Sequence, residues 1–522
     1  MFKLSDTDST STELTTERED LEFILKSSVP GLVNSTVRDA KKDRNEASAL
    51  HDRSATGHKL LVEPSVFNMG ILLAPSLAFL NRLKDVVPPH SGVVLSTLTS
   101  FLDDFLVNVF YPQLDETLIE LCTRCMNDLD AFQPDPKWPE HSQKPIFKGT
   151  VLLFDVILGV CSMLDSLPHD QTFSQLVITQ LRAYYDRCFE WAKVLLQRLA
   201  PDGSAKMRLA ADLATSGNVS HIIIKLLTNT SIPDSDSELA EQETEALITL
   251  AKSRTIEEAD LIHDRKSLAA LCTLHTSMKW LSARSQALKY ISPRAIDSSN
   301  TSSHHNRRWT ETQTTSLSSA PAGPYLPLDV NTAREFDNVV TSFTELSSLI
   351  LRTLHIDLRL HLLHGISTAS RTTYALEQPY NDPDPAVLAL TSSLASYDTQ
   401  LTTHLLQSQY AFITAQLDVL AAGALVSLIS MVPAMDEHGL ARMQLNVLVL
   451  QQCLKNVQAD ASLEKAARFY EIGMQGPDEV VENGRKEGFR VEDLKYLIRL
   501  IWRAERDGLK GGGPAEWADR IQ

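Results

Sequence analysis

Apolar residues between Thr97 and Met126 recur at helical spacing on both sides of a proline. The first run has polar residues on its other side and therefore predicts an amphipathic helix; it comprises Leu98, Phe101, Leu102, Phe105, Leu106 and Val109. Pro112 predicts a kink or break, because it cannot donate to the carbonyl group of Asn108. The second run resumes the spacing, with Leu114, Leu118, Leu121, Cys122, Cys125 and Met126. The stretch therefore provides apolar surface for packing, and it contains no set of side chains typical of a catalytic site.

Helical patterns of the same kind continue to the end of the chain, and convincing alternation of period two is absent. At the common helix length, the sequence predicts roughly fifteen to twenty helices. Successive helices joined by short turns pack antiparallel. We therefore expect an all-α fold, an elongated rod of consecutive helical bundles.

Composition and breaker residues divide the chain into six segments. Ser/Thr-rich and charged stretches predict disorder, and proline-rich loops separate the helical parts. The predicted segments are a mostly disordered polar N-terminal segment (1–58), the first helical bundle or bundles (59–200), a second bundle (201–292), a disordered Ser/Thr-rich insertion (293–328), a third bundle (329–476), and a C-terminal helical bundle and tail (477–522).

Charge and hydropathy narrow the classes of function. The net charge of −17 disfavours nucleic-acid binding, because an acidic surface repels phosphate groups. The first twenty residues lack the apolar core of a signal peptide. The longest nearly uncharged apolar run, Val419–Val432, is shorter than the roughly 18 residues that span a bilayer, so it predicts a buried core helix and no transmembrane segment. Six scattered cysteines fit a reducing cytosol better than a disulfide framework.

Cys122-Thr-Arg-Cys125 has the spacing of half a zinc site or of a redox pair. No second such pair and no Cys-x-x-His partner lies at a useful distance, and the flanking sequence is helical. A structural zinc site needs four ligands. Both cysteines also fall on the apolar stripe, so core packing is the favoured interpretation.

Asp357, His361 and His364 stand at i, i+4 and i+7, where one helical face presents all three as candidate transition-metal ligands. In the alternative interpretation, His361 lies on the core stripe with Asp357 as its local hydrogen-bond partner. No fourth ligand can be named, and we favour the alternative.

His304-His305 and Arg307-Arg308-Trp309 lie in the Ser/Thr-rich segment. They are candidates for contact with acidic lipid or for a regulated site, and a solvated linker is the favoured interpretation. The phosphate-binding, nucleophile-elbow and zinc-protease motifs do not occur. The sequence therefore predicts no enzyme, with no catalytic, cofactor-binding or metal-binding residues and no cofactor.

Four long blocks resemble one family, the Sec-eight subunit of the exocyst (exocyst complex component 4), the second of them its fungal form in particular. They contain FLDDFLVNVFYPQLDETL (101–118), KPIFKGTVLLFDVI with LPHDQTFSQLVITQLRAYYDRCFEW (144–191), FDNVVTSFTELSSLILRTLHIDLRLHLLH (336–364) and GLARMQLNVLVLQQCLKNV (439–457). Their order and spacing also fit the family, and the similarity covers most of the chain from about residue 60. The resemblance is to the C-terminal half only, so we expect the family's N-terminal coiled-coil half to be missing here.

The resemblance implies a non-catalytic scaffold that tethers post-Golgi secretory vesicles to the plasma membrane before SNARE-mediated fusion. It implies helical-bundle rods of the tethering-complex type and other exocyst subunits as partners, with small GTPases and SNARE regulators as further candidates. The implied location is cytoplasmic and peripheral, at sites of polarised secretion such as the bud tip, hyphal tip or septum, with indirect membrane contact. The alternative is a peripheral membrane or small-GTPase effector module acting outside the exocyst.

Overall fold

The computed structural model describes residues 65–86, 104–165, 171–199, 203–228, 233–291, 324–376, 378–484 and 486–504. The chain divides into two compact units, Met1–Phe79 and Leu80–Gln522. In the first unit, the described residues are Ser65 and the N-terminal part of α2 (Val66–Val86). The prediction of disorder for residues 1–58 lies outside the described residues.

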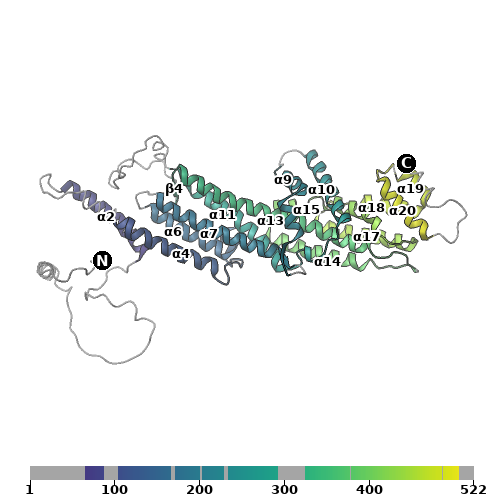
Figure 1. The fold of residues 1–522 in the computed structure, drawn as a ribbon, viewed down its shortest axis with the longest axis horizontal. Helices are drawn as coiled ribbons and strands as arrows, with labels where there is room; N and C mark the ends of the chain where they lie inside the picture. The colour runs from purple at the N-terminus through teal and green to yellow at the C-terminus, as the bar shows by residue number, and fades with distance from the viewer. Residues whose placement is uncertain are drawn as a thin grey trace, which may run out of the picture. The chain divides into compact units, whose positions relative to one another are not determined.

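The described part of the second unit is built almost entirely from helices (Figure 1). Its first helices are η1, a π-helical turn (Leu106–Phe110), α4 (Tyr111–Asn127), α5 (Trp138–His141), α6 (Lys148–Asp165), α7 (Gln171–Leu196), α8 (Leu209–Thr215), α9 (Asn218–Thr228), α10 (Pro233–Ser253), η2 (Glu258–Asp260) and α11 (Arg265–Leu288). These are followed by α13 (Val330–Ser370), α14 (Pro385–His404), α15 (Gln407–Thr414), α16 (Leu417–Ser427), η5 (Leu428–Met431), α17 (Glu437–Val457), α18 (Glu464–Gln475), α19 (Pro477–Asn483) and α20 (Val491–Ala504). The prediction of an all-α fold is confirmed.

Two short strand pairs interrupt the helices. Strand β1 (Gln197–Leu199) pairs antiparallel with β2 (Ala205–Met207), and β3 (Lys289–Ile291) pairs in parallel with β4 (Leu326–Leu328). Three residues are too few for an alternating pattern to be recognised in sequence. In each pair, one strand directly follows a helix and the other precedes the next one, and neither pair forms a sheet layer.

The prediction that residues 293–328 are a disordered insertion is wrong at its C-terminal end. Tyr325, Leu326 and Leu328 are at most 3% exposed, and Ser174 of α7 donates a hydrogen bond to the carbonyl group of Pro327. The Ser/Thr-rich composition of the segment concealed this short apolar stretch, which is held by β3 and α7. The part before Pro324 lies outside the described residues.

The irregularity predicted at Pro112 takes the form of a π-helical turn, not of a gap in the helix. The amide group of Tyr111 donates to the carbonyl group of Leu106, five residues earlier. Such a wide turn is a known way to accommodate a disturbed hydrogen-bond ladder. It leaves Leu106 and Phe110 buried, whereas Val109, predicted to lie on the apolar stripe, is 41% exposed.

Helix α13 is the central element of the second unit. Asp329 caps its N-terminus by accepting from the amide group of Thr332, and the helix continues for 41 residues. The predicted face of this helix is buried; it comprises Phe336, Val340, Phe343, Leu346, Ile350 and Leu354. Between Thr353 and Leu363 every side chain is buried, as expected for a helix surrounded by others.

The helices that pack on α13 come from several of the segments predicted from sequence. Its most extensive partner is α11, and α7, α8, α14, α15 and α16 also pack against it. Helices α11 and α13 were expected in different bundles, the second (201–292) and the third (329–476), yet they lie against each other. The six-segment division stays a prediction.

Within the described residues, Gln407–Met431 is long and apolar enough to qualify as a membrane-spanning stretch. It consists of α15, α16 and η5, interrupted at Gln416, whose φ of 54° lies in the left-handed region. Two thirds of its apolar window is buried inside the fold. An interrupted and buried stretch of this kind forms part of a helical core, as the sequence predicted for Val419–Val432.

We predict opposite effects for two glycine-to-alanine substitutions. In Gly439→Ala, the added Cβ would lie 1.9 Å from the carbonyl oxygen of Tyr374, which is backbone and cannot rotate away. Overpacking of this kind should destabilise the fold by about 2 kcal/mol or more. The control is Gly159→Ala in α6, where the new Cβ would meet no atom within 4 Å beyond the adjacent backbone of its own helix, and stability should rise by about 0.5–1 kcal/mol. Thermal unfolding followed by circular dichroism measures both, and an unchanged melting temperature for Gly439→Ala would contradict the close approach.

Candidate functional site

The two cysteines of the Cys-x-x-Cys sequence are buried on α4. Cys122 is fully buried and Cys125 is 8% exposed. Burial raises the pKa of Cys122 to about 12 and, as the main cause, raises that of Cys125. Both groups therefore remain thiols at neutral pH, whereas metal binding and thiol exchange use the thiolate. Their surroundings suit core packing, which is the interpretation favoured from sequence.

Asp357, His361 and His364 lie on α13, but they do not converge on a common point. One carboxylate oxygen of Asp357 accepts from the backbone amide group of Ile262 at 3.2 Å, and the other accepts from the Tyr397 hydroxyl group at 3.1 Å. His361 Nε2 lies 3.5 Å from Asp357. His364 Nδ1 instead lies 2.9 Å from the carbonyl oxygen of Ile256.

These contacts join α13 to its neighbours. Ile256 and Ile262 lie in the segment between α10 and α11, and Tyr397 belongs to α14. The His361 ring also packs edge-on against the rings of His263 and Tyr397. No group of three metal-binding side chains is formed within the described ranges. The three residues therefore connect α13 to α14 and to the segment between α10 and α11.

A second buried polar cluster on α13 has no counterpart in the sequence analysis. Glu243 of α10 is 2% exposed and lies 3.0 Å from Arg359 Nε and 2.9 Å from His355 Nε2. Arg359 also donates to the carbonyl groups of Ile413 and Ala415, at 2.8 Å and 2.7 Å. Ile413 belongs to α15 and Ala415 follows its end, so one guanidinium group joins α13 to α10, to α15 and to the connection that leads to α16.

The electrostatics of this cluster favour the ion pair. Burial by itself would raise the pKa of Glu243, but Arg359 and His355 outweigh burial and lower it to about 2. Burial and Arg359 lower the pKa of His355, against the attraction of Glu243. Arg359 is therefore the charge partner of Glu243. With its donors committed to the protein, the cluster offers no group to a substrate.

We predict that Arg359→Met destabilises the fold by about 3–5 kcal/mol, because it leaves the buried Glu243 carboxylate without a cation. The double substitution Glu243→Gln with Arg359→Met removes that charge and should recover part of the loss. The control is Arg371→Met at the exposed C-terminal end of α13, expected to change stability by less than about 0.5 kcal/mol. Urea denaturation measures all three, and a double variant no more stable than Arg359→Met would contradict the buried-charge explanation.

His275 of α11 joins that helix to α13. It is 2% exposed, and its Nδ1 lies 2.8 Å from the carbonyl oxygen of Ser347. The Ser347 hydroxyl group donates in turn to the carbonyl group of His275 at 3.3 Å. Burial lowers the pKa of His275 from 6.5 to about 4.

The pKa of His275 predicts a pH dependence of stability. Because the folded-state pKa lies below the ordinary value of 6.5, the folded protein resists protonation that the unfolded chain accepts. Its contribution, about 3 kcal/mol, is present above pH 6.5 and is lost as the pH falls toward 4. Denaturation of His275→Gln should therefore show a flatter pH profile in this window than the unsubstituted chain. Substituting the exposed His221 with Gln is the control, and equal slopes for the chain and for His275→Gln would contradict the assignment.

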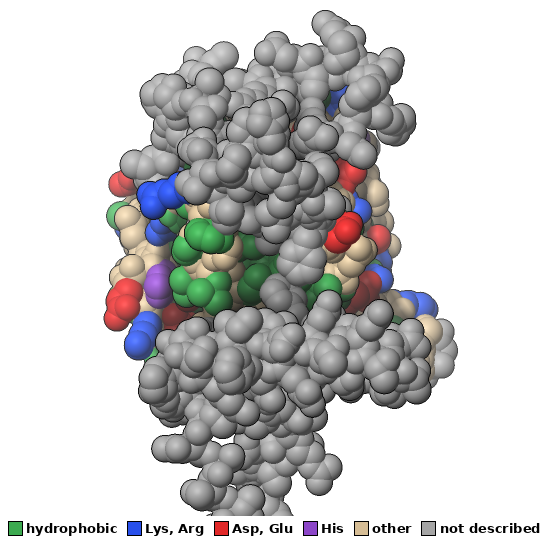
Figure 2. All heavy atoms as spheres, turned by 90° about the vertical axis from the view of Figure 1, so that its left-hand side faces the viewer, with side chains coloured by type: hydrophobic (Ala, Val, Ile, Leu, Met, Phe, Trp, Pro, Cys, Tyr) green, Lys and Arg blue, Asp and Glu red, His purple; other side chains and the backbone are tan. Residues whose placement is uncertain are grey.

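Among the described residues, exposed apolar side chains occur on several helices. Figure 2 shows hydrophobic side chains next to both acidic and basic ones on the face turned toward the viewer. On α4 and α7, Ile119 is 46% exposed and Val194 is 66% exposed. Single exposed apolar residues are common on protein surfaces and do not by themselves indicate a binding site.

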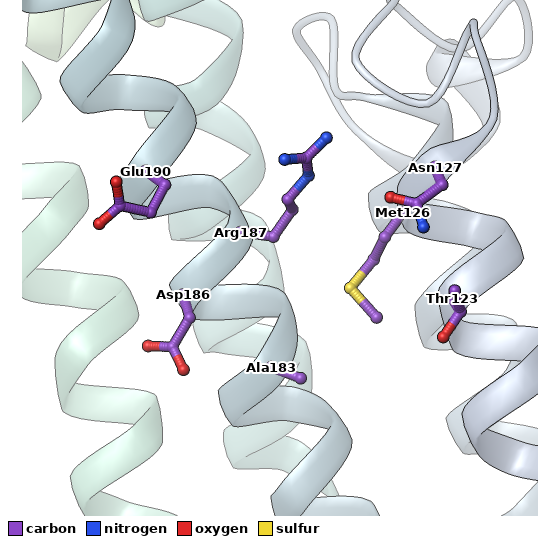
Figure 3. A pocket seen from close by; sticks show the side chains of 7 residues that line it. All are labelled: Thr123, Met126, Asn127, Ala183, Asp186, Arg187 and Glu190. Carbon is purple, nitrogen blue, oxygen red and sulfur yellow. The ribbon is translucent and has the colours of Figure 1, made fainter. Parts of the chain in front are cut away.

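An open groove of about 400 Å³ lies between α4 and α7 (Figure 3). Thr123, Met126 and Asn127 of α4 and Ala183, Asp186, Arg187 and Glu190 of α7 line it. It contains no cysteine, serine or histidine to act as a nucleophile or base. The groove lies outside the residues that the sequence analysis singled out as candidate sites.

Sequence reasoning missed the Glu243 cluster and the groove for different reasons. Glu243 reads as one more carboxylate in an acidic helical segment, and only the fold brings Arg359 beside it. The groove follows from the relative positions of two helices. The segment His304–Trp309, a candidate for lipid contact, lies outside the described residues.

Comparison with known proteins identifies relatives over most of the chain. A sequence model described as "Exocyst complex component Sec8 C-terminal" matches residues 1–77. A Neurospora crassa protein named "Probable exocyst complex component sec8" is 40% identical over 516 residues, covering 93% of this chain and 46% of the relative. "Exocyst complex component 4" of Homo sapiens is 22% identical over 468 residues, covering 85% and 46%.

The same relationship extends to Schizosaccharomyces pombe, whose "Exocyst complex component sec8" is 22% identical over 497 residues, covering 87% of this chain and 44% of the relative. The chain thus spans about half the length of the curated relatives it matches. The aligned region includes the four blocks quoted above and both polar clusters of α13. The chain therefore belongs to the family of Sec8, exocyst complex component 4.

Proposed function

We propose that this chain acts as a non-catalytic scaffold subunit of the exocyst, tethering post-Golgi secretory vesicles to the plasma membrane before SNARE-mediated fusion. The observation that carries the proposal is the 40% identity to the Neurospora crassa Sec8 protein over 93% of this chain. The proposal concerns the part of the subunit that this chain represents, because the match covers 46% of that relative.

The use of buried polar groups supports a scaffold. In the described parts of the chain, Glu243, His275, Asp357 and Arg359 are at most 4% exposed, and each contacts a neighbouring helix or the segment beside it. Enzyme sites hold such groups ready for a substrate instead. Polar contacts that fix the relative positions of helices suit a scaffold, which holds its partners in a defined arrangement.

Partners and location follow from the proposed role. We expect other exocyst subunits to be the direct partners, bound through broad helix faces of consecutive bundles divided as in the six segments above. Small GTPases and SNARE regulators are further proposed partners. The proposed location is cytoplasmic and close to the plasma membrane, at sites of polarised secretion, with the membrane contacted through other subunits.

The proposal predicts that the tagged full chain, purified from secreting cells, recovers several other exocyst subunits together. Mass spectrometry with the tag alone as the control measures this, and consistent absence of the subunits contradicts the proposal.

A second measurement separates the alternative, a peripheral membrane module acting outside the exocyst. The net charge is −17, so the purified chain should bind poorly to vesicles containing phosphatidylserine. Strong co-sedimentation with these vesicles, together with absence of exocyst subunits from the purification, favours the alternative.

A further inference from the structure

Polar side chains of α13 hold the segment between α10 and α11, residues 254–264, at two points. Asp357 accepts from the backbone amide group of Ile262, and His364 Nδ1 lies 2.9 Å from the carbonyl oxygen of Ile256. Ile256 and Ile262 are 4% and 2% exposed. Outside the short turn η2 the segment is not helical. Its position therefore depends on contacts with neighbouring elements rather than on a helix of its own.

Two imidazole rings meet directly beside the Ile262 contact. The His263 side chain is exposed, and the centroid of its ring lies 4.8 Å from that of His361, with an angle of 76° between the planes. His361 is 4% exposed, and among the described residues its Nε2 has no hydrogen-bond partner, although Asp357 Oδ2 lies 3.5 Å away. An exposed titratable ring thus packs on a buried one that has an uncommitted nitrogen.

One carboxylate serves this pair of rings, and its hydrogen bonds are already committed. Asp357 Oδ1 accepts from the Ile262 amide group and Oδ2 accepts from the Tyr397 hydroxyl group. Tyr397 of α14 and Cys272 of α11 complete the surroundings, and burial raises the pKa of each well above its ordinary value. Both groups therefore stay uncharged, and Asp357 is the anion inside the protein at this point.

The charges around His263 oppose its protonation in the folded protein. Burial lowers the pKa of His263, and the neighbouring His361 and His364 lower it further, whereas Glu258 and Asp357 act in the opposite direction. Because the folded-state pKa lies below the ordinary value, the contribution of this contact is present above about pH 6.5 and is lost as the pH falls below it.

We propose that the contact between His263 and His361 is a pH-sensitive latch, which keeps Ile262 bound to Asp357 at neutral pH and releases it when both rings are protonated. Two imidazolium groups at this spacing repel each other, and a single carboxylate can neutralise only one of them. The latch is a property of this chain by itself, so it does not rest on the proposed scaffold role.

Arg208 limits how far the opening extends. Its guanidinium group donates to the carbonyl groups of Ala259 and Leu261, and it stays charged throughout this pH range. The release is therefore confined to Ile262 and His263. It exposes the apolar side chain of Ile262 next to α13, so the acid form presents apolar surface that the neutral form buries.

Hydrogen–deuterium exchange of the full chain at pH 7.5 and pH 5.5 tests the latch, with each rate corrected for the intrinsic effect of pH. Protection of the Ile262 amide group, read from overlapping peptides, should fall at least about tenfold at pH 5.5. The amide groups from Thr353 to Leu363 inside α13 should keep their protection. His263→Phe keeps an aromatic ring at this exposed position but cannot take up a proton, so it should leave Ile262 protected at both pH values.

The matched control is His221→Phe, the same change at an exposed histidine of α9, which should behave like the unsubstituted chain. Equal protection of Ile262 at the two pH values in the unsubstituted chain overturns the proposal. An undiminished loss in His263→Phe also overturns it, because another group then causes the opening. Loss of protection inside α13 together with Ile262 indicates global unfolding rather than a local latch, and it has the same consequence.

Discussion

The fold of the second unit depends on one arginine, Arg359, which donates hydrogen bonds to carbonyl groups at the break between α15 and α16. The chain turns at Gln416 in a left-handed conformation, and the turn leaves carbonyl groups without helical partners inside the protein. Arg359 donates to two of them and pairs with Glu243 at the same time. Without this group the α15–α16 segment would have to extend its helix or expose those carbonyl groups to solvent. The ion pair therefore determines where α10 and the α15–α16 segment lie relative to α13.

This arrangement explains why α13 tolerates so many polar side chains inside the protein. A buried charge or histidine is costly unless its partners are in place, so each such group on α13 restricts the position of a neighbour. Asp357 binds the backbone amide group of Ile262, and His355 reaches the carbonyl group of Phe412. The apolar face supplies the driving force for packing, and these polar contacts select one arrangement among many that would bury the same area.

The apolar face of α13 could be predicted because its pattern repeats for many turns, and the six residues predicted for this face, from Phe336 to Leu354, are buried. The Asp357–His361 pair was open to two interpretations, because local spacing cannot say whether Tyr397 or a metal ion completes it. Glu243 and Arg359 are 116 positions apart in the sequence (359 − 243), so their pairing is a property of the fold alone. Strand β4 was missed because it follows a segment whose composition resembles a linker.

The π-helical turn before Pro112 links local sequence to the orientation of α4. Because the extra residue is absorbed there, Phe110 rather than Val109 faces inward, and the buried series continues through Leu114, Leu118 and Cys122. With that face directed into the protein, Thr123 and Met126 are left on the side that borders the groove beside α7. Pro112, where a kink or break was predicted, lies in the first turn of α4, directly after the π-helical turn. The rotation of α4 that places Cys122 in the core thus also leaves Thr123, Met126 and Asn127 to line the groove beside α7, so one feature of the helix determines both its buried face and its open face.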